Sequence, residues 1–96
     1  MALTQDQINN NLENVPQWEV SNEKFISRSF KFKQYMDGVQ FAYDIGRTAE
    51  ERDHHPSVQI EYGEVVVAVT SHDEGGLTER DFKLAQTIDD IFEKMK

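Results

Sequence analysis

The 96-residue sequence contains no cysteine, only two prolines and a single tryptophan. Without cysteine the chain has neither a disulfide framework nor a thiolate metal site, which is typical of a protein in the reducing cytoplasm. No stretch approaches the roughly 20 apolar residues that a membrane-spanning helix needs, so no membrane partner is expected. The first residues lack a basic segment followed by an apolar one, so we expect no signal peptide. These absences predict a cytoplasmic protein.

Positive charge is also scarce, and this restricts the partners of the chain. Ten lysines and arginines stand against eighteen aspartates and glutamates, which gives a formal net charge of -8 at pH 7. Most of such a surface repels a phosphate backbone. We therefore expect no nucleic-acid partner.

The length bounds the architecture, because a chain of this size can bury one modest hydrophobic core but not two. We expect a single domain over residues 1–96. The apolar pattern alternates between the periods of helix and strand. It predicts a helix over residues 5–14, strands over 18–20 and 25–32, a helix over 34–53, strands over 58–62 and 64–70, and a helix after Thr78. This α-β-β-α-β-β-α order predicts an α+β fold, an antiparallel four-stranded sheet with helices packed on one face.

The sequence also predicts the direction in which several side chains point. The helix over 34–53 is predicted to turn one stripe inward, formed by Met36, Val39, Ala42, Tyr43, Gly46 and Ala49. One further turn places Glu50 and Asp53 on the edge of that stripe, beneath the helix and near the histidines. Arg28 falls on the apolar face of its strand, and we expect it near a sheet edge with its charged end in water. Val66 and Ala68 leave the opposite sheet face apolar, so another subunit is expected to cover one surface of the sheet or its edge.

The three histidines all stand beside carboxylates and turn residues. His54 and His55 precede Pro56, which restricts the backbone before it, so the chain leaves the helix sharply there. We expect His54 to face inward and His55 to line the rim. His72 follows a valine-rich strand, and the two segments are predicted to meet at one end of the sheet. Because imidazole changes charge near neutral pH, with a free pKa of roughly 6.5, such a group suits proton transfer or metal binding.

These alternatives differ in their geometric demands. Three imidazoles and a water can hold catalytic zinc, but adjacent histidines diverge, and the sequence has neither a His-x-His nor a His-x-x-x-His pair. Metal-free general acid and base catalysis is therefore favoured, with each proton transfer worth about 10²–10⁴ in rate. The remaining alternatives are surface histidines with Asp53 and Asp81 only capping helices, and a non-catalytic dimerisation or protein-binding module.

Three motifs together carry a resemblance to a known family. They are AEERDHHP at residues 49–56, TSHD at 70–73 and GLTERD at 76–81. With Trp18 and the segment 30–32, they closely resemble the pterin-4a-carbinolamine dehydratase family, also known as the dimerisation cofactor of a homeodomain transcription factor. The resemblance covers nearly the whole chain. It departs after Pro56, where Ser57-Val58 stands in place of an acidic and an aromatic or aliphatic residue.

The resemblance implies a lyase that dehydrates 4a-hydroxytetrahydropterin to quinonoid dihydropterin in tetrahydropterin recycling, without a metal or organic cofactor. It implies His54 and His72 as the acid and base pair, and His55 as a residue that binds and orients the pterin. The residues implied to support the imidazoles or contact the substrate are Glu50, Asp53, Pro56, Ser71 and Asp81. The expected partners are the pterin and further copies of the chain, in a homodimer or homotetramer.

Overall fold

The computed structural model describes residues 2–22 and 24–96, except for the side chain of His72. Its helices are α1 (Gln5–Leu12), α2 (Tyr35–Arg52) and α3 (Glu79–Lys94), its strands are β1 (Glu19–Ser21), β2 (Phe25–Lys31), β3 (Ser57–Glu61) and β4 (Glu64–Val69), and a 3-10 turn spans His72–Glu74. The α+β order predicted from the sequence is confirmed. In the described part of the chain, no helix is both long and apolar enough to cross a membrane.

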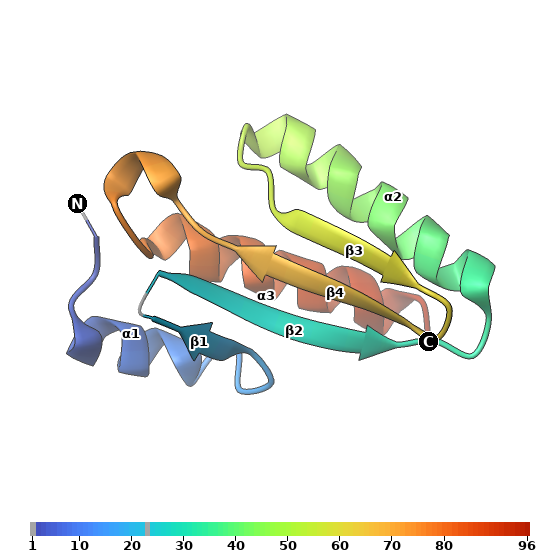
Figure 1. Cartoon of the computed structure of the whole chain (residues 1–96), viewed down its shortest axis with the longest axis horizontal. Coiled ribbons are helices and arrows are strands. Elements are labelled where there is room, and N and C mark those ends of the chain that lie inside the picture. Colours follow the sequence, from blue (N-terminus) through green and yellow to red (C-terminus); the bar gives the residue numbers. More distant parts are fainter. Residues whose placement is uncertain (1, 23) are drawn as a thin grey trace.

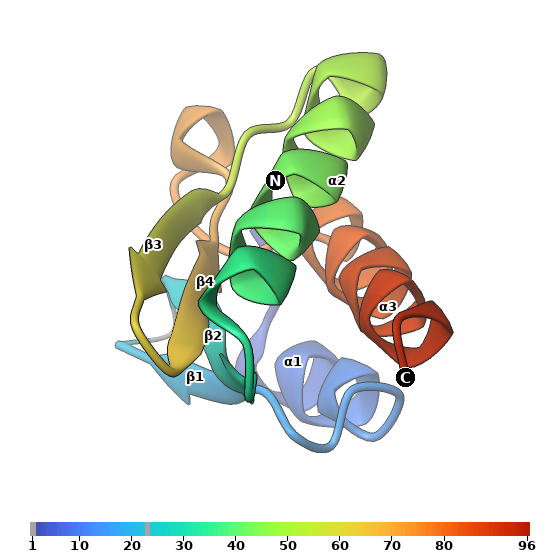
Figure 2. The ribbon, with the colours of Figure 1, turned by 90° about the vertical axis from the view of Figure 1, so that its right-hand side faces the viewer.

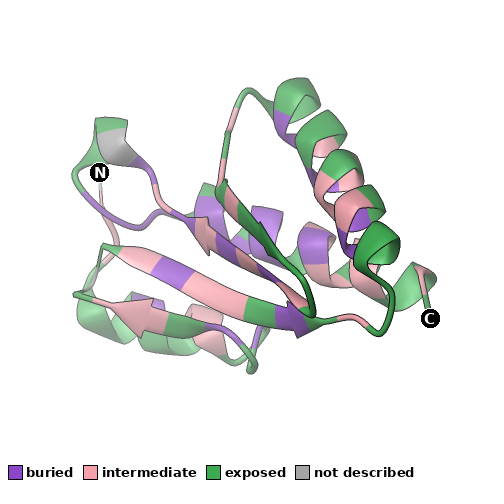
Figure 3. Ribbon diagram, turned by 45° about the vertical axis from the view of Figure 1, so that its right-hand side comes forward, coloured by how far each residue is buried: buried purple, intermediate pink, exposed green. Residues whose placement is uncertain are grey.

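The four strands form one antiparallel sheet in the order β1-β2-β4-β3. Two sequential hairpins therefore lie side by side, joined through β2 and β4 (Figure 1). The three helices lie on the same side of this sheet (Figure 2). Val65, Val67 and Val69 of β4 are fully buried, as their alternation predicts. Buried residues gather where the helices face the strands (Figure 3).

The first and last helices begin where their capping residues predict. The Thr4 hydroxyl accepts a hydrogen bond from the Gln7 backbone N–H at 3.3 Å, and the Thr4 backbone N–H donates to Gln7 Oε1 at 2.8 Å. At the start of α3, the Asp81 carboxylate accepts from the Thr78 backbone N–H at 2.8 Å. These reciprocal caps satisfy donors that a helix start would otherwise leave unpaired.

The inward face of α2 differs from the predicted stripe. The residues that α2 buries are Gly38, Phe41, Ile45 and Ala49. Met36 and Tyr43 are 67% and 62% exposed, so their assignment to the core was wrong. The larger apolar side chains of Phe41 and Ile45 set the rotation of the helix, because burying them removes the most apolar surface from water. The same rotation carries Glu50 into solvent, with its side chain 77% exposed, rather than beneath the helix.

Arg28 also departs from its prediction, because β2 is an inner strand of the sheet and not an edge. Arg28 Nη1 donates to Asp89 Oδ1 on α3 at 2.8 Å, and the arginine side chain is only 12% exposed. The Trp18 indole N–H donates to the same oxygen at 2.8 Å. The guanidinium also lies 4.3 Å from the Phe30 ring centroid, within the range of a cation–π contact. The Asp89 carboxylate on α3 thus takes the place of the water that was expected around the charged end of Arg28.

Asp89 gives the stability of this core a defined pH dependence. Burial raises its pKa above the ordinary 3.8, outweighing the hydrogen bonds from Trp18 and Arg28 that lower it. At pH values between the ordinary pKa, which the unfolded chain has, and the raised pKa of the folded protein, the folded protein binds more protons. The free energy of unfolding therefore falls as pH rises through this range. Asp89→Asn should lack this fall in the free energy of unfolding, because asparagine does not titrate. Urea unfolding of both proteins at intervals from about pH 4 to 7 measures the difference, and parallel profiles would contradict it.

Candidate functional site

The candidate site lies where the end of α2 meets the connection between β4 and α3. Asp53 ends α2 in the left-handed conformation, with φ 51° and ψ 43°, which its short polar side chain tolerates better than most residues do. The following backbone N–H, of His54, donates back to the Ala49 carbonyl at 3.1 Å. The chain therefore reverses sharply and sends His54 towards the sheet. Asp53 itself is exposed, and its contribution to the site is this backbone turn.

His54 faces inward, with its side chain only 9% exposed. Its Nε2 lies 2.9 Å from Asp81 Oδ1 and 3.0 Å from the Thr70 carbonyl oxygen. Neither a carboxylate nor a carbonyl oxygen can donate, so Nε2 carries the proton and donates to both. In the neutral ring, Nδ1 is then the unprotonated nitrogen. The fold thus fixes both the orientation and the tautomer of this imidazole.

Asp81 is the centre of the buried polar cluster, and its side chain is fully buried. The Ser71 hydroxyl donates to its two carboxylate oxygens at 3.1 and 3.0 Å, and the Thr78 backbone N–H donates to Oδ2 at 2.8 Å. With the bond from His54, the carboxylate accepts from three separate segments of the chain. Such compensation is what a buried carboxylate requires. Asp81 therefore caps α3 and orients His54 at the same time.

His55 points away from this cluster. It is 55% exposed, and its Nε2 is hydrogen-bonded to Glu50 Oε2, which is itself exposed. Glu50 thus pairs with the imidazole of His55 in solvent, and its supporting role in the site stays a prediction. Pro56 is half-buried beside it.

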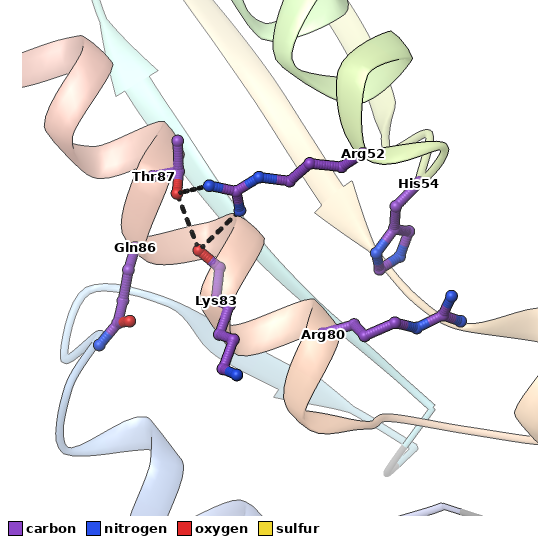
Figure 4. A pocket seen from close by; sticks show the side chains of 6 residues that line it. All are labelled: Arg52, His54, Arg80, Lys83, Gln86 and Thr87. Carbon is purple, nitrogen blue, oxygen red and sulfur yellow. Dashed lines mark hydrogen bonds between the residues drawn. The ribbon is translucent and has the colours of Figure 1, made fainter.

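The two adjacent imidazoles line different cavities. His54 lines one of about 520 Å³, together with Arg52, Arg80, Lys83, Gln86 and Thr87 (Figure 4). His55 and Pro56 line another of about 380 Å³, together with Phe25, Ser57, Ala68 and Thr70. The two side chains thus diverge at the helix exit, and a ligand that contacts both must extend from one cavity to the other.

His72 lies at the start of the 3-10 turn that follows β4. Its side chain is outside the described part of the structure, so its meeting with the other histidines stays a prediction. The backbone hydrogen bond from Glu74 N to the Ser71 carbonyl, at 3.0 Å, closes this turn. Gly75, with φ 76°, then gives the chain a left-handed residue on its way to α3.

Metal-ligating side chains do not converge anywhere in the described residues, where no three of His, Asp and Glu are grouped to hold an ion. The polar groups of the site that the structure describes instead form hydrogen bonds with one another. Asp81 is occupied by Ser71, Thr78 and His54. The arrangement suits the orientation of a proton-transfer group.

Several residues of the site were missed by sequence reasoning. The Thr70 carbonyl and the Thr78 backbone N–H act through the main chain, which leaves no signature in residue type. Arg52, Arg80 and Lys83 are charged residues on helix surfaces, a pattern that usually indicates solvated faces. Their one available signal was proximity in sequence, because Arg52 precedes Asp53 and Arg80 precedes Asp81.

Sequence comparisons identify relatives along nearly the full chain. The profile of the family described as "Pterin 4 alpha carbinolamine dehydratase" matches residues 1–91. A protein of Picosynechococcus sp., provisionally named pterin-4-alpha-carbinolamine dehydratase, is 42% identical over 93% of this chain and 96% of its own length. A Sulfolobus acidocaldarius protein with the same provisional name is 38% identical over 95% of this chain and 99% of its own.

Solved structures share the fold. A crystal structure described as a transcriptional coactivator/pterin dehydratase from Brucella melitensis has a TM-score of 0.89 and 35% identity, covering 95% of this chain and 98% of that one. A pterin dehydratase-like protein described as a RuBisCO assembly factor of the alpha-carboxysome has a TM-score of 0.67 and 17% identity. It covers 79% of this chain and 92% of that one, and it is similar in fold alone.

Proposed function

Because the chain belongs to the pterin-4a-carbinolamine dehydratase family, we propose that it dehydrates a 4a-hydroxytetrahydropterin to the quinonoid dihydropterin. In this reaction the C4a–O bond breaks, a C=N bond forms to a ring nitrogen, and water leaves. The hydroxyl must gain a proton and the ring nitrogen must lose one, with no net oxidation. Two groups that exchange protons near neutral pH meet these needs.

The observation that carries this proposal is the fixed imidazole of His54. Asp81 and the Thr70 carbonyl hold its Nε2–H, which leaves Nδ1 as the basic nitrogen. His54 thus acts as the general base, taking the proton from the ring nitrogen in the cavity that it lines. Asp81 stabilises the imidazolium that results, as a buried carboxylate does in other histidine–aspartate pairs.

The acid is then assigned to His72 and the binding role to His55. A protonated His72 delivers the proton to the departing hydroxyl, and His55, with Glu50 behind it, orients from its own cavity the part of the pterin that extends beyond the cavity of His54. Support for these roles comes from the motifs TSHD and DHHP in a chain of this family. After one turnover the two imidazoles have exchanged protonation states, and solvent restores them. Asp53, Pro56 and Ser71 act by shaping the two segments that carry the histidines.

Carbinolamine dehydration followed by absorbance tests the activity, with the spontaneous reaction as the baseline. We expect the purified protein to accelerate the reaction in proportion to its concentration. Dialysis against a metal chelator is expected to leave the rate unchanged, because imidazoles alone supply both proton transfers. A rate equal to the baseline would refute the dehydratase. Loss of rate on dialysis, with recovery on adding zinc, would refute the metal-free mechanism.

We also propose that the chain self-associates through the sheet face that the described helices leave uncovered. Val66 lies on that face, because its neighbours Val65 and Val67 are buried beneath the helices, and it is only half-buried itself. Light scattering is expected to give the mass of a dimer or tetramer at micromolar concentration. Val66→Lys should shift the mass towards the monomer, because a charge in an apolar interface is costly. A monomeric wild-type protein would refute this association.

A further inference from the structure

The cavity beside His54 is lined by cations although the protein as a whole is acidic. Three of its lining residues are Arg52, Arg80 and Lys83, and the lining drawn from the described residues includes no carboxylate. A second cavity, of about 390 Å³ between α2 and α3, mixes Asp44 and Glu51 with its cations. Against a net charge of -8, the cavity beside His54 is therefore a local concentration of positive charge.

Arg52 is fixed in place without being neutralised. It reaches from the last turn of α2 to α3 (Figure 4), where Nη2 donates to Thr87 Oγ1 at 2.7 Å and Nη1 to the Lys83 carbonyl at 3.4 Å. Both acceptors are uncharged, and among the described residues no carboxylate lies within ion-pair distance of the guanidinium. The remaining N–H donors form the planar fork that matches phosphate or carboxylate oxygens.

Lys83 and Arg80 differ in what they already bind. Arg80 contacts Asp73 at 3.1 Å and donates to the Ser71 hydroxyl at 3.3 Å. The Lys83 ammonium has no carboxylate within ion-pair distance among the residues that the structure describes. Arg52 and Lys83 are therefore the two cations of this cavity whose charge is available to a ligand.

We propose that Arg52 and Lys83 form a subsite for a phosphate group on the side chain of the pterin, so that the preferred substrate is a phosphorylated carbinolamine. This assignment rests on the proposed function, which places the ring against His54. The cavity of about 520 Å³ has the size of a small-molecule site. A phosphate ester carries a charge of about -1.5 to -2 at pH 7, which matches two cations more closely than a carboxylate does.

The test compares two 4a-carbinolamines that differ only in carrying a phosphate ester or a free hydroxyl on the side chain. Wild-type kcat/KM is expected to be about tenfold or more higher for the phosphorylated one, mainly through KM, since hydrogen bonds to charged groups contribute this much. In the double variant Arg52→Gln/Lys83→Gln this ratio should fall close to one. Arg52→Lys/Lys83→Arg, which retains both charges, should keep most of it. Arg47→Gln/Lys94→Gln, which removes two positive charges from the second cavity, controls for loss of charge alone.

Titration with oxidised, unreactive pterins separates this inference from the proposed function. If the wild-type protein turns over both carbinolamines with a kcat/KM ratio near one, the subsite is overturned and the dehydratase stands. The same holds if the double variant keeps the wild-type ratio. No turnover of either, with tighter binding of the phosphorylated pterin that Arg52→Gln/Lys83→Gln abolishes, would support the subsite and refute the dehydratase. Inorganic phosphate is titrated as well. If it binds in an Arg52- and Lys83-dependent manner while the phosphorylated pterin gains nothing over the neutral one, the substrate assignment is overturned.

Discussion

Replacing His54 by glutamine is expected to lower kcat for carbinolamine dehydration by about 10²–10⁴, the usual contribution of one general acid or base. Glutamine retains an N–H that can donate to Asp81, but it has no basic nitrogen to take a proton. The buried cluster should therefore stay satisfied while the chemistry is lost. Initial rates at saturating substrate measure the effect, and circular dichroism checks that the fold is kept. His54→Ala should lose as much activity and also some stability.

The neighbouring histidine provides a matched comparison for this result. His55→Gln changes an exposed imidazole that lines the other cavity and pairs with Glu50. We expect it to raise KM more than it lowers kcat, because His55 is assigned to binding. His72→Gln should lower kcat as His54→Gln does. If kcat of His54→Gln stayed within about threefold of wild type, below the smallest effect expected of a catalytic base, the base would have to be another group.

Replacing Asp81 by alanine is expected to lower the free energy of unfolding by about 3 kcal/mol or more. The substitution leaves the Ser71 hydroxyl and the Thr78 backbone N–H without the buried carboxylate, and it leaves the His54 Nε2–H with the Thr70 carbonyl as its remaining acceptor. It also removes the cap of α3. Activity should fall with it, because the His54 ring loses the carboxylate that stabilises its imidazolium, although the Thr70 carbonyl still accepts from Nε2–H. Urea unfolding and initial rates measure the two effects separately.

Two further variants separate the charge of Asp81 from its hydrogen bonds. Asp81→Asn keeps the shape and one acceptor oxygen, so it should cost less stability than Asp81→Ala while still lowering kcat. Asp73→Ala removes an exposed carboxylate that pairs with Arg80, a contact expected to contribute at most about 1 kcal/mol. If Asp81→Ala were no more destabilising than Asp73→Ala, the buried cluster would not have the stabilising role assigned to it.

Local patterns in the sequence were sufficient for the elements and for part of the site. Thr4 and Gln7 mark the first helix start, and Thr78 with Asp81 marks the last, because a capping box lies within four residues. Pro56 and the residues before it predicted the sharp helix exit that sends His54 inward and His55 outward, and both directions are confirmed. All of these inferences depend on spacings of a few residues.

The tertiary structure decided which side chains meet. Arg28 and Asp89 are 61 residues apart, and nothing near Arg28 in sequence indicates that α3 brings a carboxylate against an inner strand. The rotation of α2 was decided by packing Phe41 and Ile45 against the sheet, which overrode an equally periodic stripe and carried Glu50 into solvent. Helical periodicity alone does not choose between neighbouring faces when both contain apolar residues.

The sequence by itself therefore determined the fold class, the family and the segments that carry the histidines, because these follow from periodicity, caps and short motifs. Only the packed chain placed Asp81 under His54, separated the two adjacent imidazoles into different cavities, and gathered Arg52 and Lys83 around one of them. The physical reason is that hydrogen-bond partners and cavity linings depend on distances between elements, which the sequence sets only through the packing of the whole core.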